Sequence, residues 1–286
     1  MVDFIIASLA DGLLLGFVYG IAAMGLSLIW GVMDVINLSH GSIIALGMMG
    51  VYLAFNDLGM NPYMALPLVA AAGLLLGGLI YGVAVHRVRD APHLSTLLAT
   101  FSIDMIVVGI GTAIFTTSPR NVDFSLGSVS LGPVTLPWTR VAAALAAILV
   151  TGLLYLFLYR TRPGKSIRAV ANNRAAAELM GIPSSQVLAL SFGLGAMLAA
   201  IAGGLIATFF PFTILAGTGY QVKGFVICVL GGLGNPLGAL IGGLILGALE
   251  GIIPVFMETT WVPVLEFVLF VIILLVRPAG LLGSKT

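Results

Sequence analysis

The sequence predicts an all-α integral membrane protein with eight or nine transmembrane helices, some of them broken. Hydrophobic residues make up 60% of the 286 residues and charged residues 8%, and the mean hydropathy is +1.17. A water-soluble domain carries about 25% charged residues, so this composition argues strongly against a soluble enzyme. Long apolar runs follow one another along the chain, and 37 glycines are spread through them, as is typical of closely packed membrane helices.

The apolar runs give the expected helices in order, because a transmembrane helix needs about 20 apolar residues. Runs of that length, or nearly so, cover 4–30, 39–56, 62–85, 94–117, 139–159, 185–210, 236–256 and 261–276, and a shorter run covers 219–231. The first run has neither a basic segment before it nor a small-residue cleavage site after it, so we interpret it as a retained span. We expect one transmembrane domain, 1–286, with no soluble domain attached.

The basic residues predict the orientation in the membrane. With nine crossings, most of them fall on one side: Arg87, Arg89, Arg160, Arg162, Lys165, Arg168, Arg174, Arg277 and Lys285. The other side carries Arg120 in a polar loop and Arg140 at an interface. Because cytoplasmic loops are rich in Lys and Arg, we expect the C-terminus in the cytoplasm and the N-terminus outside. Eight crossings would require a re-entrant segment, so nine are preferred.

Several functions are disfavoured by what the chain contains. A net charge of +1 indicates no nucleic-acid partner, and three histidines and one cysteine are too dispersed for a metal site or a catalytic triad. The tripeptide Gly164-Lys165-Ser166 is not an ATP-binding loop, because that motif requires a glycine where the chain has Tyr159. We therefore expect no enzyme activity, and no cofactor bound by this chain. Cys228 is most simply a small core residue.

Small residues repeat every four positions in two of the expected helices. Gly12, Gly16 and Gly20 form one series and Gly243, Gly247 and Gly251 another. Spacing of four places each series on one helix face, so we expect close helix packing there. This pattern does not select a function.

A polar, glycine-containing break follows the first apolar run, from Trp30 to Ser42. Backbone that leaves helical geometry within a membrane is buried in protein or lines a water-filled cavity. Asn37, Ser39 and His40 therefore either line the substrate path or satisfy one another in a structural loop, and Ser39 is placed to cap the next helix. His40 alone fits a hydrogen-bonded scaffold better than a ligand or a proton relay.

Asp104 lies about ten residues into its span, which places it roughly 15 Å deep, near the middle of a hydrocarbon core of about 30 Å. An acid at that depth normally faces the bundle interior or a wet cavity. Asp104 either attracts the ammonium group of a zwitterionic solute or is protonated and bonded to neighbouring backbone.

Lys223 and Glu250 belong to the outer halves of adjacent spans in this topology. We expect them to form a buried ion pair, which offsets the cost of burying either charge alone. A structural role fits this pair better than a substrate-binding role.

The segment from about 164 to 182 is polar and basic, so it lies in water beside the membrane. Helix formers run from Ser166 to Met180, Pro163 and Gly164 end the preceding span, and Gly181 caps the helix before Pro183 stops it. Arg174 and Glu178 are neighbours one helical turn apart. The segment is longer than a connector between two spans requires, so we interpret it as a docking helix for a soluble partner.

Four segments together resemble one family. The stretch from Gly25 to Gly47, GLSLIWGVMDVINLSHGSIIALG, resembles the signature near the start of branched-chain amino acid ABC transporter permeases. The docking segment GKSIRAVANNRAAAELMGI is similar to their cytoplasmic loop that contacts the ATPase. The stretch from Gly217 to Gly251 resembles their later block, and RPAGLLG resembles their C-terminal ending. The resemblance spans essentially the whole chain.

The resemblance implies a permease subunit of an ATP-driven importer, with a type II importer-like fold, in the bacterial inner membrane. It implies a second homologous permease, two cytoplasmic ATP-binding subunits that hold ATP and Mg, and a periplasmic solute-binding protein. It also implies that the docking helix couples the permease to the ATPase. The residues implied in this contact are Arg168, Asn172, Arg174, Glu178, Met180 and Gly181. The implied solute is a branched-chain amino acid or a similar small solute.

Alternatives remain for the solute and the mechanism. Asp104 stands where this family resemblance implies an uncharged residue, and close relatives import urea, short amides or other amino acids. Monosaccharide permeases have a similar break and late block. A stand-alone secondary carrier would transport without ATP or partners, although such carriers usually have more intramembrane ionisable residues than this chain does.

Overall fold

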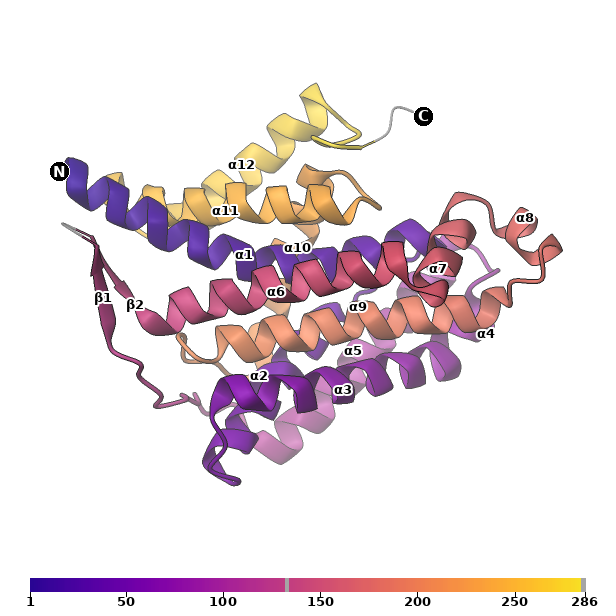
Figure 1. The fold of residues 1–286 in the computed structure, drawn as a ribbon, viewed down its shortest axis with the longest axis horizontal. Coiled ribbons are helices and arrows are strands. Elements are labelled where there is room, and N and C mark those ends of the chain that lie inside the picture. The colour runs from indigo at the N-terminus through magenta and orange to yellow at the C-terminus, as the bar shows by residue number, and fades with distance from the viewer. Residues whose placement is uncertain (132–133, 284–286) are drawn as a thin grey trace.

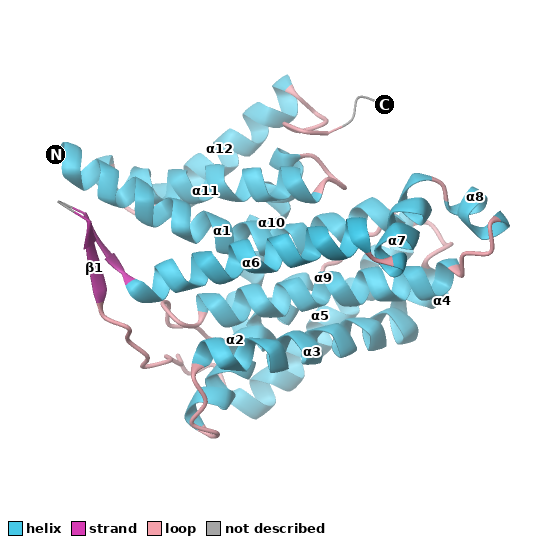
Figure 2. Cartoon of the chain, in the orientation of Figure 1, coloured by secondary structure: helices cyan, strands magenta, loops and turns pink. Residues whose placement is uncertain are grey.

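The computed structural model describes residues 1–131 and 134–283, so Lys285 lies outside the described residues. Long helices lie side by side along the longest axis of the molecule (Figure 1), and the strands of the described residues form one small hairpin (Figure 2). The elements in chain order are α1 (Val2–Met33), α2 (His40–Asn56), α3 (Pro62–Ile80), the π-helical turn η1 (Tyr81–Val85), α4 (His86–Val88), α5 (His93–Phe115), β1 (Ser128–Leu131), β2 (Val134–Pro137), α6 (Trp138–Arg160), α7 (Arg162–Asn172), α8 (Arg174–Leu179), α9 (Ser184–Ile206), the 3₁₀ turn η2 (Ile214–Ala216), α10 (Gly217–Gly231), α11 (Pro236–Phe256) and α12 (Trp261–Val276).

Apolar helices long enough to cross a membrane make up most of this architecture. Within residues 1–131 and 134–283, seven helical segments have the length and composition of a membrane span, and the apolar helices α2 and α12 are somewhat shorter. The predicted class, an all-α membrane protein of eight or nine helices, is confirmed. The predicted runs coincide with these helices, including the short one at 219–231, which lies in α10. The turn η2 runs directly into α10, and together they form one span-length segment, Ile214–Gly231.

The core lies along α1 and α9. In the most apolar stretch of each, 83% of the residues are buried, against 11% in α5. The helices α2, α3, α10 and α11 surround this pair. The structure therefore places α5 at the edge of the bundle, where only Thr96, Thr100 and Gly111 of this helix are buried.

The two glycine series pack against each other, which confirms the predicted close contact. A Cβ added to Gly12 would lie 2.3 Å from the carbonyl oxygen of Gly247, and one added to Gly16 would lie 2.8 Å from that of Gly243. Only glycine permits the two backbones to approach so closely. The backbones of α1 and α11 are therefore in direct contact along the two glycine series.

A β-hairpin interrupts the helical order between α5 and α6, where the sequence analysis expected only a polar loop around Arg120. Strands β1 and β2 are antiparallel, with Val129 opposite Leu136. Alternation of small polar and apolar residues in Ser128–Leu131 is the sequence basis for this strand. Arg120 exchanges two backbone hydrogen bonds with Phe212, which ties this connection to the end of α9.

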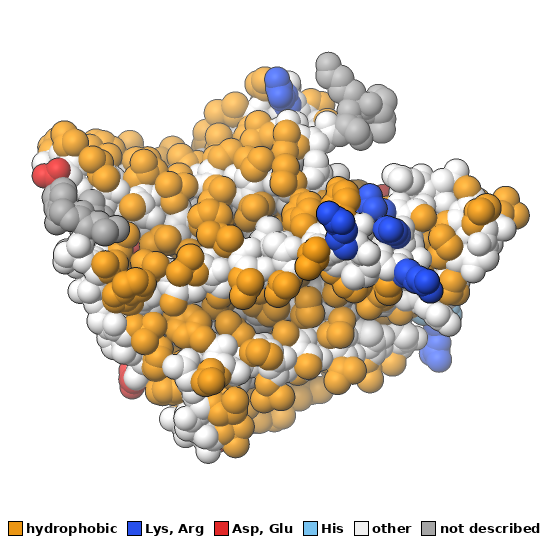
Figure 3. All heavy atoms as spheres, viewed as in Figure 1, with side chains coloured by type: hydrophobic (Ala, Val, Ile, Leu, Met, Phe, Trp, Pro, Cys, Tyr) orange, Lys and Arg blue, Asp and Glu red, His pale blue; other side chains and the backbone are white. Residues whose placement is uncertain are grey.

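The two ends of the bundle differ in charge. The N-terminus and the hairpin lie at one end, and α4, α7 and α8 lie at the other (Figure 1). Apolar side chains cover much of the flank, whereas Lys and Arg side chains gather toward the α7 end (Figure 3).

Candidate functional site

The docking segment consists of two helices, α7 and α8, where a single helix was predicted. Asn173 separates them: its backbone is extended (φ −159°, ψ 102°), and its Oδ1 accepts a hydrogen bond of 2.9 Å from the N–H of Ala176. Asparagine is among the best helix N-caps, so it starts a new helix where helix formers alone predict a continuous one.

The start of this segment also differs from the prediction. The span α6 ends at Arg160, and Pro163 and Gly164 lie in the first turn of α7 instead of ending the span. Proline is tolerated there because the first N–H groups of a helix have no partner within it. A Cβ on Gly164 would lie 2.1 Å from the carbonyl oxygen of Phe157. This glycine therefore permits α7 to fold tightly against the end of α6.

Gly181 ends α8 as predicted. Its φ is +79°, its N–H donates to the carbonyl of Glu178, and the N–H of Ile182 donates to the carbonyl of Ala177, both at 3.0 Å. This pair of bonds is the Schellman motif, which requires a left-handed residue at the position of Gly181. The turn directs the chain from α8 into α9.

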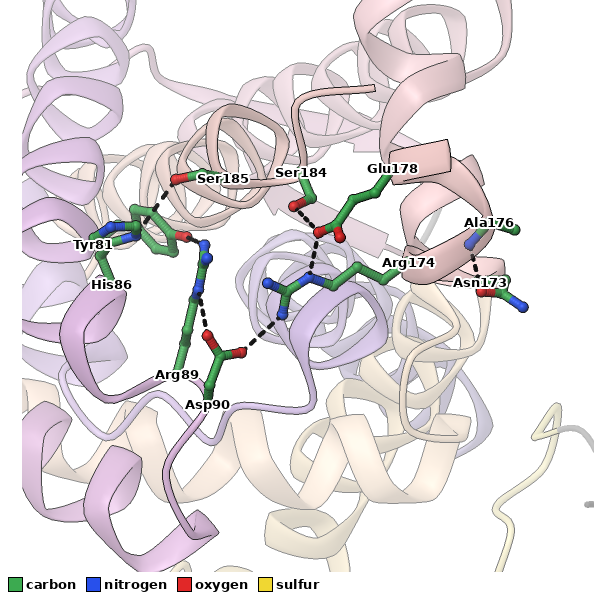
Figure 4. A network of polar contacts seen from close by, with 10 residues as sticks. All are labelled: Tyr81, His86, Arg89, Asp90, Asn173, Arg174, Ala176, Glu178, Ser184 and Ser185. Atoms are coloured by element: carbon green, nitrogen blue, oxygen red, sulfur yellow. Dashed lines mark hydrogen bonds and ion pairs between the residues drawn. The ribbon is translucent and has the colours of Figure 1, made fainter. Parts of the chain in front are cut away.

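A polar network connects α8 to three other parts of the chain (Figure 4). Arg174 donates from Nε to Glu178 at 3.1 Å and from Nη1 to Asp90 at 3.0 Å. Ser184, at the start of α9, donates to the same carboxylate of Glu178. Asp90 also accepts from Arg89 at 3.2 Å, and Arg89 reaches the hydroxyl of Tyr81 at 3.0 Å. The network thus joins α8, the start of α9, the loop before α5 and the π-helical turn that follows α3.

Hydrogen bonds within this network determine the protonation of its two carboxylates, Asp90 and Glu178. Hydrogen bonds from Arg174 and then Arg89 lower the pKa of Asp90, and hydrogen bonds from Ser184 and then Arg174 lower the pKa of Glu178. A carboxylate with a lowered pKa stabilises the folded arrangement above its ordinary pKa, and this contribution is lost as pH falls through the lowered value. Both carboxylates are therefore ionised at neutral pH.

The remaining docking residues fall into two groups. Leu179 and Met180 are 89% and 82% exposed at the tip of α8, and Asn172 is exposed at the end of α7. Arg168 instead faces its own chain: its Nε donates to the carbonyl of Leu158 at 3.1 Å, and its guanidinium lies 4.2 Å from the ring centre of Tyr159. Arg168 anchors α7, whereas the tip of α8 presents an apolar surface.

The break after α1 turns back into the bundle. His40 Nε2 donates to the carbonyl of Ala22 at 2.8 Å, and Ala22 lies about 16 Å before the end of α1 at 1.5 Å per residue. Helix α2 therefore begins near the middle of α1. Thr100 of α5 accepts from the N–H of Leu38, and Gln221 of α10 donates to the carbonyl of Asn37, both at 3.2 Å, so side chains of two other helices satisfy the freed backbone.

Asn37, Ser39 and His40 are fully buried, and the cavities described below do not include them. Ser39 starts α2, yet its hydroxyl makes no cap bond to that helix and donates instead to Asn37 Oδ1 at 2.7 Å. The prediction that the Ser39 side chain caps α2 is therefore wrong, because its hydroxyl is directed toward Asn37 and accepts no N–H of the helix. These contacts support the structural alternative for the break.

Asp104 does not reach the core of this chain. It is half-buried on α5 between exposed apolar residues, including Phe101 and Met105. Among residues 1–131 and 134–283, no hydrogen bond or ion pair joins its carboxylate to another side chain. Asp104 therefore lies on a face of α5 that the rest of this chain covers only in part. Its place in a substrate path stays a prediction.

Lys223 and Glu250 are in contact, as expected from the sequence. Nζ of Lys223 lies 2.8 Å from Glu250 Oε2, and the side chains are 24% and 22% exposed, so the pair is half-buried rather than enclosed. Two further groups join it: Glu266 of α12, 3.8 Å from Lys223, and the hydroxyl of Tyr19, which donates to Glu250 at 3.3 Å.

Asp90, Ser184 and Glu266 were not predicted from the sequence as members of a site. A signal existed for Glu266, which is an acid inside an apolar run. Asp90 and Ser184 stand in ordinary polar connections, and only the fold brings them to Arg174 and Glu178.

Residues 8–276 match the family described as "Branched-chain amino acid transport system / permease component". The chain is 30% identical to the high-affinity branched-chain amino acid transport system permease protein BraD of Pseudomonas aeruginosa, over 96% of this chain and 94% of that protein. It is also 30% identical to the corresponding protein LivH of Escherichia coli, with the same coverage.

More distant similarities extend beyond these proteins. The ribose import permease protein RbsC of Escherichia coli is 29% identical, over 82% of this chain and 73% of that protein. A solved structure, PsaBC from Streptococcus pneumoniae in complex with Fab, has a similar fold, with a TM-score of 0.50 at 16% identity and coverage of 98% and 97%.

Proposed function

Because the chain belongs to the branched-chain amino acid transport system permease family, we propose that its solute is a branched-chain amino acid or a similar small amino acid. It is a multi-pass inner-membrane permease subunit of an ABC importer. The names of the relatives BraD and LivH support this solute class.

The exposed tip of α8 is the surface that receives force from a partner ATPase. Leu179 and Met180 place two large apolar side chains in water, and such exposed groups are typical of an interaction site. Arg174 and Glu178 hold the tip to the loop before α5 and to α9. Movement of α8 is therefore transmitted to two membrane helices, which switches the side on which the solute path is open.

The partners follow from this role. An ABC permease associates with ATP-binding and substrate-binding components. Here they are a second homologous permease that completes the path, two cytoplasmic ATP-binding subunits that hold ATP and Mg, and a periplasmic solute-binding protein. Residues 1–286 form one transmembrane domain without an ATPase site or a cofactor of its own.

The orientation places α7, α8 and the C-terminus in the cytoplasm and the N-terminus outside. The gathering of Lys and Arg at the α7 end supports this (Figure 3), because cytoplasmic segments carry the excess of basic residues.

The single observation that carries the mechanism is the exposed apolar tip of α8 held by the Arg174 network. The test is ATP-driven uptake of leucine into proteoliposomes that contain the complete transporter and its binding protein. We expect uptake that requires ATP, the ATPase subunits and the binding protein. Uptake by this chain alone would instead establish a secondary carrier.

Ribose is a second candidate solute, because RbsC is 29% identical over 82% of this chain. Uptake of labelled leucine in the same proteoliposomes with excess ribose or excess isoleucine separates the two. We expect isoleucine to compete and ribose to have no effect. Competition by ribose alone would assign the sugar.

A further inference from the structure

Two adjoining cavities lie around the Lys223–Glu250 pair, near the end of the bundle that carries the N-terminus. Their volumes are about 520 and 390 Å³, and both are lined by Lys223, Glu250 and Phe210. The larger cavity also reaches Thr259, in the exposed turn between α11 and α12. Volumes of this order are typical of sites for small molecules.

The larger cavity carries charges of both signs. Asp11 and Arg140, from α1 and α6, form an ion pair on its wall, and Lys223 and Glu250 form a second pair from α10 and α11. The guanidinium of Arg140 also lies 5.3 Å from the ring centre of Phe210. Four separate helices thus direct ionisable side chains to one space.

Both pairs retain hydrogen-bonding capacity. A lysine has three donors and an arginine five, more than these contacts use. Within residues 1–131 and 134–283, the buried atoms Asp11 Oδ1 and Glu266 Oε1 have no hydrogen-bond partner, although Glu266 Oε1 lies 3.8 Å from Lys223 Nζ. A buried acceptor without a partner is costly. The larger cavity therefore offers spare donors on Lys223 and Arg140 and a spare acceptor on Asp11.

An apolar wall completes the cavity. Leu15 and Val262 are buried beside the charged groups, and Phe210 lies between the two cavities. If the Lys223–Glu250 ion pair served only to join two helices, it would need neither the Asp11–Arg140 pair nor the cavity beside it. Ionisable side chains within a membrane bundle commonly mark the path of a solute.

We propose that this cavity binds a zwitterionic α-amino acid with an apolar side chain as it enters the permease. The carboxylate of the solute lies against Arg140 and Lys223, its ammonium group against Asp11 and Glu250, and its side chain against Leu15 and Val262. This inference rests on the proposed function, since it assigns a residence site to the same solute.

The test is equilibrium binding of labelled leucine to the purified permease–ATPase complex in nanodiscs, without the binding protein. Unlabelled leucine, leucinamide, which lacks the carboxylate, and 4-methylpentanoate, which lacks the ammonium group, serve as competitors. We expect leucine to compete and the other two to compete weakly. Lys223→Met and Asp11→Asn should each weaken binding about ten- to hundred-fold, as loss of a charged hydrogen-bond partner does. Asp123→Asn, in an exposed loop, is the matched control and should bind as the wild type does.

Absence of leucine binding, or equal competition by leucinamide, would overturn the site. The competitor series decides this on the wild-type complex even where a variant fails to fold. If the site fails while ATP-driven leucine uptake with the binding protein persists, the proposed function stands. If the complete transporter does not import leucine, the proposed function itself is wrong.

Discussion

Lys223 and Gly181 show what a single residue contributes in this chain. Lys223 contacts two acids, and its Nζ lies 5.1 Å from the ring centre of Tyr19. The sequence predicted its pairing with Glu250 because both lie at similar depth in neighbouring spans. It did not predict Glu266, because assigning a third partner requires the packing of α12 against α10. Gly181 was predictable, because a glycine after a run of helix formers is a local signal.

Removal of one member of the Lys223–Glu250 pair should destabilise the protein more than removal of both. Lys223→Met leaves Glu250 and Glu266 without their cation, whereas Lys223→Met combined with Glu250→Gln leaves fewer unbalanced charges. A fully buried pair loses about 3–5 kcal/mol when it is broken, and we expect about 1–3 here because the side chains are roughly one-quarter exposed. Thermal unfolding of the purified complex measures this. Strictly additive effects of the two substitutions would contradict the coupling.

Substitution of Gly181 should uncouple ATP hydrolysis from uptake and leave membrane insertion intact. A β-carbon in the left-handed conformation costs about 1–2 kcal/mol, so Gly181→Ala should loosen the end of α8. Gly181→Asn is the matched control, because asparagine tolerates this conformation better. The ratio of leucine imported to ATP hydrolysed measures the coupling. An unchanged ratio in Gly181→Ala would argue against a role for this turn.

The helices differ in how far the sequence predicts them. The apolar runs predicted the membrane spans, and the spacing of the glycines predicted the close contact that α1 and α11 make. The division of the docking segment into α7 and α8 was missed because a strong helix pattern spans Asn172 and Asn173, while the cap at Asn173 depends on one side-chain bond. The exposure of α5 was missed because its apolar residues are spread around the whole helix, so no apolar stripe distinguishes a core face from an exposed one.

Gly247→Val should disrupt the packing of α1 against α11. A Cβ at this position would lie 2.4 Å from the carbonyl oxygen of Gly12 and 2.5 Å from Cα of Gly16, both of them backbone atoms that cannot rotate away. Overpacking of this kind costs about 1–3 kcal/mol or more. Gly152→Ala in α6 is the control, because its Cβ would meet no atom within 4 Å. Folded yield on size exclusion should fall for Gly247→Val only. Equal yields would contradict the close contact.

The whole molecule is an apolar bundle whose two ends differ in charge. Composition alone predicted an integral membrane protein, because so few charged residues cannot cover the surface of a water-soluble domain. The polar network around Arg174 and the cavity around Lys223 depend on residues far apart in the chain, so they emerge only from the fold.

Labelling of single cysteines from each side of the membrane tests the orientation. Cys228 is fully buried, so its background reaction with a membrane-impermeant thiol reagent should be small. Ser130→Cys in the hairpin should react from outside in intact cells, and Ser166→Cys in α7 only after the membrane is opened. The reverse pattern would place α7 outside and exclude its contact with a cytoplasmic ATPase.

The most direct test of force transfer through α8 is site-specific cross-linking in the complete transporter. A photoreactive side chain at Met180, which is 82% exposed, should cross-link to an ATP-binding subunit, and the same group at Ser130 in the hairpin should not. We expect the yield from Met180 to change when ATP is added, because the interface moves during the cycle. Normal ATP-driven uptake without any cross-link from Met180 would contradict the coupling role of α8.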